Sequence, residues 1–312
     1  MRMSLIARSA VALASAALVL TACGGGNDPL SSGSGQTSGA AAAPADTIVV
    51  GSANFAESQI LAEIYAQALA AKGVTVEKRL NIGSRETYIP GLQDGSIDLI
   101  PEYTGVLLQY FDSGAEQTSS DEVYTALKDT LPGNLEVLDK STAEDKDAVV
   151  VTRETATRLN LTTLADLGPQ CGEMVFGGAP EFQTRPDGIP GLEKTYSCTF
   201  KEYRSLDAGG PLTVAALKNG DVQAANLFTT QSAIPANDFV ALEDPKNNFA
   251  AQNVVPLVNK DKASDTVRTT LNEISTKLTT EGLTALNAEA DSDAKPSPET
   301  VAKNWLSQNG LA

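Results

Sequence analysis

Two aromatic residues, Tyr103 and Phe228, occupy equivalent positions in a short internal repeat and are the first candidates for binding chemistry. Residues 92–103 read LQDGSIDLIPEY, and residues 217–228 read LKNGDVQAANLF. Each pattern predicts a helix end, a glycine that stops the helix, and a strand that ends in the aromatic. Open α/β sheets bind ligands at the carboxyl ends of their strands. The repeat therefore predicts two halves that each present one ring to a ligand; alternatively, such units are common and both rings are core.

The composition excludes most catalytic chemistry. The chain has no histidine, and its three cysteines form no CxxC pair. Histidine-based triads, proton shuttles at neutral pH and the usual zinc sites are therefore excluded. A mechanism that uses carboxylates alone stays possible, but no pair of acids stands out by spacing. The sequence predicts a binding protein that is not an enzyme and that needs no cofactor and no metal.

The first residues have the pattern of a secretory signal that ends at a cysteine. Arg2 and Arg8 precede an apolar run over residues 10–20, which is too short to span a bilayer as a mature helix. The run ends in LTAC, which resembles a bacterial lipobox. We expect a signal peptide over residues 1–22 and a lipidated Cys23, and the alternative is an ordinary signal peptide that contains a cysteine. Residues 23–46, rich in Gly, Ser and Ala, are predicted to be a flexible tether.

The charge balance is strongly acidic. The chain carries 23 basic and 39 acidic side chains, for a net charge of −16. Removal of Arg2 and Arg8 with the signal would bring the net charge to −18. Nucleic acid and anionic lipid are therefore poor partners.

Cys171 and Cys198 remain for pairing once Cys23 is assigned to the lipid. Two cysteines in an oxidising compartment are more often a disulfide than two free thiols. A closed loop of about 27 residues would stabilise the fold by about 3 kcal/mol. We therefore predict a Cys171–Cys198 bridge, with two buried free cysteines as the alternative.

From residue 47 the hydrophobic pattern alternates between strands and helices, which predicts an α/β fold with helices covering the sheet. Asn54 follows the first apolar strand and is placed to cap the first helix. After residue 147 the alternation begins again. Ser297 followed by Pro298 has the order expected at the start of the last helix. Strands are expected over residues 47–51, 74–80, 97–103, 135–138, 148–152, 174–176, 199–206 and 253–258, and one more strand is expected to end at about residue 228. Helices are expected over residues 85–93, 121–130, 154–159 and 213–218, and one more helix is expected to begin near residue 104.

Four segments resemble, in the same order, the substrate-binding proteins of osmoprotectant importers, which take up glycine betaine, choline, carnitine or proline betaine. They read GSANFAE at 51–57, DLIPEYTG at 98–105, PEFQTRPDG at 180–188 and NGD at 219–221. The resemblance runs from about residue 47 to the C-terminus. It implies a two-lobe periplasmic-binding-protein fold, type II-like, in which each lobe is a mixed sheet flanked by helices and two chain crossings form the hinge. The implied lobes are residues 47–146 plus 254–312, and residues 147–253.

The resemblance also implies roles for three residues. In this family a cage of tyrosines holds the quaternary ammonium, and an arginine holds the carboxylate. Tyr103 matches a cage tyrosine, Phe228 stands where another is usual, and Arg185 falls on the carboxylate-binding arginine. A methylated ammonium donates no hydrogen bond, so an aromatic face is its best partner, while arginine grips a carboxylate in a bidentate fork.

Other positions depart from the family pattern. Asp147 and Gln252 stand where two further cage tyrosines are expected. An aspartate and a glutamine suit a ligand with donors on its nitrogen better than a fully methylated one. Thr104, beside the cage tyrosine, and Asn54, interpreted first as a helix cap, complete the predicted ligand-binding set.

The resemblance therefore implies an extracytoplasmic, lipid-anchored and monomeric solute-binding protein of an ABC importer. Its two lobes would close on a cationic or zwitterionic solute and deliver it to a permease in the cytoplasmic membrane. One alternative is a lipid-anchored sensor or scaffold that uses the same fold. Another is a binder of a different amine-containing solute, because the aromatic cage is incomplete.

Overall fold

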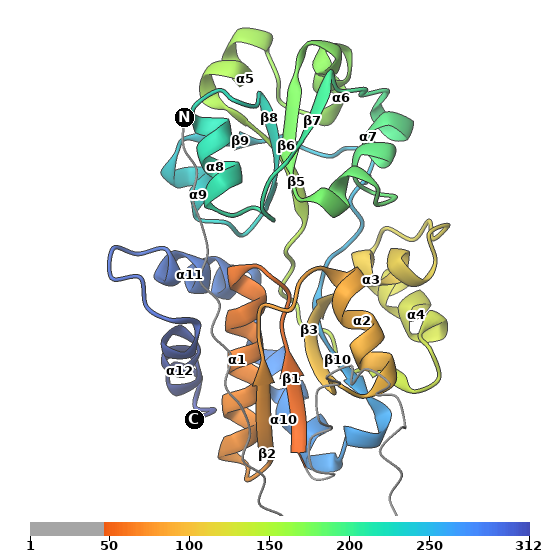
Figure 1. The fold of residues 1–312 in the computed structure, drawn as a ribbon, viewed down its shortest axis with the longest axis vertical. Helices are drawn as coiled ribbons and strands as arrows, with labels where there is room; N and C mark the ends of the chain where they lie inside the picture. The colour runs from red at the N-terminus through yellow and green to blue at the C-terminus, as the bar shows by residue number, and fades with distance from the viewer. Residues whose placement is uncertain (1–46) are drawn as a thin grey trace, which may run out of the picture. The chain divides into compact units, whose positions relative to one another are not determined.

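The structure is a computed structural model, and it describes residues 47–312 (Figure 1). The predicted signal peptide, Cys23 and the predicted tether lie outside the described residues. Among the helices of residues 47–312, none is long and apolar enough to cross a membrane.

The first sheet holds five strands in the order β2-β1-β3-β10-β4. β1 (Thr47–Gly51) is parallel to β2 (Thr75–Arg79) and β3 (Leu99–Tyr103). β10 (Val254–Asn259) is antiparallel to β3 and to β4 (Leu135–Val137). The sheet is therefore mixed, because one strand from far along the chain is inserted between β3 and β4.

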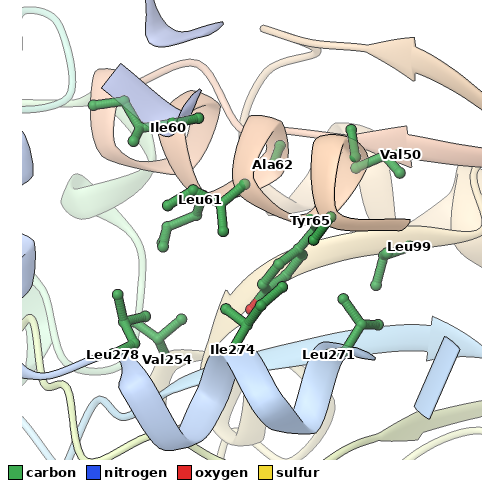
Figure 2. Close-up of a cluster of buried hydrophobic side chains, with 14 of the residues drawn as sticks. Val50, Ile60, Leu61, Ala62, Tyr65, Leu99, Val254, Leu271, Ile274 and Leu278 are labelled. Carbon is green, nitrogen blue, oxygen red and sulfur yellow. The ribbon is translucent and has the colours of Figure 1, made fainter. Parts of the chain in front are cut away.

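Helices cover both faces of this sheet, as apolar strands without polar alternation predict. On one face, the sheet packs against α1 (Ala56–Ala71), α10 (Asp265–Lys277), α11 (Thr280–Ala290) and α12 (Pro298–Asn309). Figure 2 shows Leu61 and Tyr65 of α1 beside Ile274 of α10 in this cluster. On the other face, α2 (Arg85–Asp94), α3 (Thr104–Phe111) and α4 (Ser120–Thr130) bury a second cluster.

The second sheet repeats this topology in the order β7-β6-β8-β5-β9. β6 (Val175–Gly178) is parallel to β7 (Glu202–Ser205) and β8 (Ala224–Phe228), and β5 (Asp147–Thr152) is antiparallel to β8 and β9 (Phe239–Ala241). One face packs on α5 (Arg153–Leu159), α6 (Leu164–Leu167) and α7 (Ile189–Tyr196). The other packs on α8 (Pro211–Lys218) and α9 (Ala233–Ala236). The predicted α/β class with helix-flanked sheets is confirmed.

The internal repeat corresponds to a structural repeat. Gly95 after α2 and Gly220 after α8 have φ values of 78° and 76°, a left-handed conformation that glycine adopts without strain. Each glycine leads into the third strand of its sheet order, β3 or β8. The two candidate aromatics, Tyr103 and Phe228, are the last residues of these strands.

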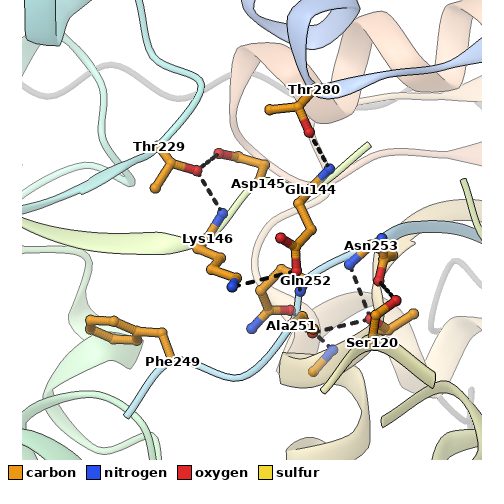
Figure 3. A network of polar contacts seen from close by, with 12 residues as sticks. Ser120, Glu144, Asp145, Lys146, Thr229, Phe249, Ala251, Gln252, Asn253 and Thr280 are labelled. Atoms are coloured by element: carbon orange, nitrogen blue, oxygen red, sulfur yellow. Dashed lines mark hydrogen bonds and ion pairs between the residues drawn. The ribbon is translucent and has the colours of Figure 1, made fainter. Parts of the chain in front are cut away.

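The chain passes twice between the two sheets, over residues 138–146 and 242–253. The two segments run side by side: Asp145 N donates to the Gln252 carbonyl at 3.2 Å, and Val254 N donates to the Ala143 carbonyl at 3.0 Å. Figure 3 shows the side chains that reinforce them, including Glu144, whose Oε1 accepts from Gln252 N at 3.2 Å. The division into separate lobes near residues 147 and 253 stays a prediction.

A disulfide joins Cys171 to Cys198, whose Cα atoms lie 5.3 Å apart. Both cysteines are buried in the core of the second sheet. The bond ties the 3₁₀ turn at Gly168–Glu173 to the segment that follows α7.

Some local predictions were wrong. Helix α1 begins at Ala56 with Phe55 at the N-cap, so Asn54 does not cap it. At the start of α2, Ser84 is the N-cap residue, and its hydroxyl donates to Glu86 Oε2 at 2.6 Å. The short elements β9, α6 and α9 were not predicted, because three or four residues show no hydrophobic period.

Candidate functional site

Six of the seven predicted ligand-binding residues line one cavity, whose walls come from both halves of the structure. The cavity lies at the carboxyl ends of β3 and β8, where the repeat places it. The lining residues among the predicted set are Asn54, Tyr103, Asp147, Arg185, Phe228 and Gln252.

Thr104 is the exception. It is fully buried, and its hydroxyl donates to the Ala251 carbonyl at 3.2 Å and accepts from Asn253 N at 3.1 Å. These bonds fix the start of α3 against the returning chain segment. The residue supports the wall of the site from behind and is not among the lining residues.

Three aromatic rings stand together at this cavity. The ring centroid of Phe55 lies 6.0 Å from that of Tyr103 and 5.4 Å from that of Phe228. Phe55 therefore bridges the two predicted rings, which come from different sheets. Phe55 was not among the predicted ligand-binding residues, although it lies within the family-like segment 51–57. Tyr88 also lines the cavity.

The ring of Tyr103 is held by a buried polar network. Its hydroxyl donates to Glu57 Oε1 at 2.6 Å. Glu57 Oε2 accepts from Thr230 Oγ1 at 2.7 Å and from Asn287 Nδ2 at 2.6 Å. Burial, with help from the Glu57 carboxylate, raises the pKa of Tyr103 well above 10, so the hydroxyl stays a donor. Because Thr230 follows β8, this network also links the two halves.

Arg185 faces a carboxylate within the protein. Its Nη2 lies 3.1 Å from Asp147 Oδ2, and Asp147 Oδ1 accepts from Asn226 Nδ2 at 2.8 Å. Burial works against the charge of Arg185, but Asp147 and Asp187 outweigh it and raise the pKa of the guanidinium. Arg185 and Asp147 thus form a charge pair on the cavity wall, and the two predicted ligand contacts are also partners of each other.

A second guanidinium, on Arg85, was not selected from the sequence. Its Nε and Nη2 bond the two oxygens of Glu102 at 2.8 and 2.7 Å, and Tyr88 also donates to Glu102 Oε1 at 2.7 Å. Glu102 is fully buried. The bidentate pair neutralises Arg85 and holds it rigidly in the cavity wall.

Asp145 is a further buried acid at this cavity. Its Oδ1 accepts from Thr230 N at 3.0 Å and from Thr229 Oγ1 at 3.2 Å. Burial, together with the nearby Glu57 carboxylate, raises its pKa well above 3.8. A cation bound beside Asp145 would offset this effect and favour the carboxylate.

Gln252 presents a donor to the site. Its Oε1 accepts from the backbone N–H groups of Gly105 and Val106 at 3.0 Å each. Its buried Nε2 has no acceptor among residues 47–312. The group that Gln252 leaves for a ligand is therefore an N–H donor, which suits an oxygen on the ligand, whereas a nitrogen carrying donors was expected.

Comparison with known proteins identifies the family. Residues 46–308 match the family described as the substrate binding domain of ABC-type glycine betaine transport systems. The chain belongs to this family. It is therefore an extracytoplasmic substrate-binding protein of an ABC transporter and not an enzyme, as the four sequence segments predicted.

Curated relatives match along most of their length. The glycine-betaine-binding protein of Pseudomonas aeruginosa is 29% identical over 285 residues, which cover 86% of this chain and 90% of the relative. The carnitine transport binding protein OpuCC of Listeria monocytogenes is 28% identical over 272 residues, which cover 85% and 87% of the two chains.

A solved structure described as a glycine betaine/carnitine/choline ABC transporter shares the fold. It superposes with a TM-score of 0.67 at 22% identity and covers 85% of this chain and 99% of its own. The two mixed sheets, the strand order and this likeness confirm the predicted type II periplasmic-binding-protein fold.

Proposed function

We propose that this family member captures a small quaternary ammonium solute, of the glycine betaine, choline or carnitine kind, in the central cavity. The relatives named above bind glycine betaine or transport carnitine. The observation that carries the proposal for this chain is the group of three rings, Phe55, Tyr103 and Phe228, drawn from both halves to one cavity.

The charges around the rings favour a positive head group. The cavity is lined by four carboxylates and only two guanidiniums, and Glu102 neutralises the guanidinium of Arg85. A methylated ammonium against aromatic faces gains about 0.5–2 kcal/mol per ring, more where water is excluded. The head group is therefore expected at the rings, near Asp145, and this is the part of the solute that sets affinity.

A carboxylate on the solute has two donors available. Arg185 lines the cavity and directs one nitrogen to Asp147, and Gln252 Nε2 has no other described acceptor. An incoming carboxylate would compete with Asp147 for the guanidinium. A zwitterion can then span the cavity from the rings to these donors.

Solute that touches both halves stabilises the closed arrangement, because it binds that arrangement better than the open one. The closed form then docks on the permease of the importer. Lipidation at Cys23, which rests on the sequence pattern alone, would hold the monomer near that permease. Labelling with a radioactive fatty acid, with Cys23→Ser as control, tests the anchor.

Titration calorimetry with isosteric ligand pairs tests the proposed function. Glycine betaine and 3,3-dimethylbutanoate have the same shape and the same carboxylate, and they differ in the positive charge of the head group. Choline and 3,3-dimethylbutanol differ in the same way, and neither carries a carboxylate. We expect each neutral-headed isostere to bind at least tenfold more weakly than its ammonium partner, because the cation–π contribution is removed. Equal affinity within both pairs would contradict the proposal.

A further inference from the structure

A second cavity adjoins the central one, and we call it the outer cavity. Arg85, Glu86, Val106 and Arg185 line both cavities, so the two spaces meet at the guanidiniums. Beyond them, the outer cavity is lined by Gln109, Tyr110 and Ser113 from the first half and by Thr184, Pro186 and Asp187 from the second.

The outer cavity collects buried polar atoms that lack partners. Neither oxygen of Asp187 accepts a hydrogen bond from any described residue, although only 2% of this residue is exposed. The Oε1 atom of Gln109 is buried and also lacks a donor within the described chain. Most buried polar atoms in proteins are satisfied, so three acceptors without partners at one cavity require an explanation.

Arg185 does not satisfy Asp187. Its Nε lies 3.7 Å from Asp187 Oδ1, which is too long for a hydrogen bond, and that Nε–H is itself without an acceptor among residues 47–312. The other end of the guanidinium is directed to Asp147. Burial raises the pKa of Asp187, although the nearby guanidinium of Arg185 opposes this shift.

We propose that the outer cavity is a second subsite, which binds an N–H or O–H donor group on a solute whose ammonium and carboxylate occupy the central cavity. This inference rests on the proposed function and names the solute more closely. The donors would bond Asp187 and Gln109, and the solute would reach them past Arg185. Glycine betaine carries no N–H or O–H group, so it leaves these acceptors unsatisfied.

The subsite also couples binding to closure. Gln109 belongs to α3 beside the first sheet, and Asp187 precedes α7 beside the second sheet. A donor group that bonds both residues therefore joins the two halves at a place separate from the aromatic rings. Such a solute favours the closed arrangement through two sets of contacts.

A pair of betaines of equal reach tests the inference. Nα-trimethylglutamine carries an amide NH₂ at the end of its side chain, and Nα-trimethylmethionine has a side chain of similar length without a donor. Titration calorimetry on the full chain should show that the glutamine compound binds about tenfold more tightly or better, because its amide bonds a buried carboxylate.

Two variants locate the effect. In Asp187→Asn the preference should fall to within about twofold, and in Gln109→Met it should fall about threefold, since a neutral acceptor contributes less than a charged one. Circular dichroism checks that each variant folds; if one does not, the native chain and the other variant still decide.

The outcomes separate this inference from the proposed function. If the native protein binds glycine betaine and both test compounds without preference, the outer subsite is overturned and the proposed function stands. A preference that survives in both folded variants also overturns it. If neither a betaine nor choline binds, both are overturned.

Discussion

The two halves of the central cavity are built on the same strand order but from different chemistry. At the end of β3, Tyr103 is buried, bonded to Glu57 and paired across the sheet with Val254. At the equivalent end of β8, Phe228 is half-buried and paired with Asp147. The first half thus supplies a ring fixed by a polar network, and the second supplies a ring beside a charge. A repeated topology sets where side chains lie, while their identities divide the roles.

The residue before each ring shows the same division. Glu102 precedes Tyr103 and bonds Arg85, whereas the equivalent residue before Phe228 is Leu227, which is buried in an apolar cluster. At this position the first half therefore carries a buried ion pair, whereas the second half carries an apolar residue.

Breaking this ion pair should have the largest effect on stability. We expect Glu102→Leu, which gives β3 the residue found in β8, to lower the free energy of unfolding by about 3–5 kcal/mol, because Arg85 is left buried without its partner. Urea unfolding measures the loss. The double variant Arg85→Met with Glu102→Leu should recover most of it, and a double variant as unstable as the single one would contradict the explanation.

The second half, in turn, is stabilised by the disulfide. The loop it closes spans a sequence separation of 27. Replacing both Cys171 and Cys198 with alanine should lower the free energy of unfolding by about 3 kcal/mol, chiefly by releasing constraint on the unfolded chain. Affinity for the solute should change little in the folded variant, since neither cysteine lines the central cavity. A large loss of affinity in a folded variant would contradict the expectation that the disulfide affects stability and not solute binding.

The two rings should differ in their contribution to binding. Tyr103→Ala should weaken solute binding by about 2 kcal/mol and Phe228→Ala by about 1 kcal/mol, because the buried ring is better shielded from water. Calorimetry with a quaternary ammonium solute measures both. Tyr103→Phe is the matched control, since it keeps the ring and removes only the bond to Glu57. Equal losses for the two alanine variants would show that burial does not rank the rings.

Asp145, on the segment between the halves, should produce a smaller effect that depends on pH. Its pKa is raised above 3.8 in the folded chain, so the folded state holds a proton that the unfolded state releases. This contribution to stability is complete at low pH and falls as the pH rises from about 3.8 through the raised pKa.

We therefore expect Asp145→Asn to flatten the fall in stability with pH and to raise the free energy of unfolding at neutral pH. Urea unfolding over a pH series measures the slope. The exposed residue Asp129 on α4 offers the control Asp129→Asn, which should keep the slope of the native chain. If stability fell with pH as steeply in Asp145→Asn as in the native chain, the assignment of this pH dependence to Asp145 would be contradicted.

Asp147, Arg185 and Gln252 in the cavity wall were predicted from the resemblance to a known family. The repeat and most strands and helices, but not α6, α7, α9 and β9, were determined by the sequence pattern itself. These follow from local patterns, because apolar runs fix which segments are buried and a glycine such as Gly95 fixes where a helix ends. Tyr103 and Phe228 could be predicted to face one site because each ends an equivalent strand.

Only the tertiary structure decided how the cavity wall is bonded. Phe55 lies between the two rings from the N-cap position of α1, where the cap pattern had placed Asn54. Arg185 meets Asp147 across 38 residues of sequence, and Gln252 bonds the backbone of α3 across 147. Such contacts depend on how separate segments pack. The hydrophobic periodicity along the chain does not indicate which polar atoms then form contacts.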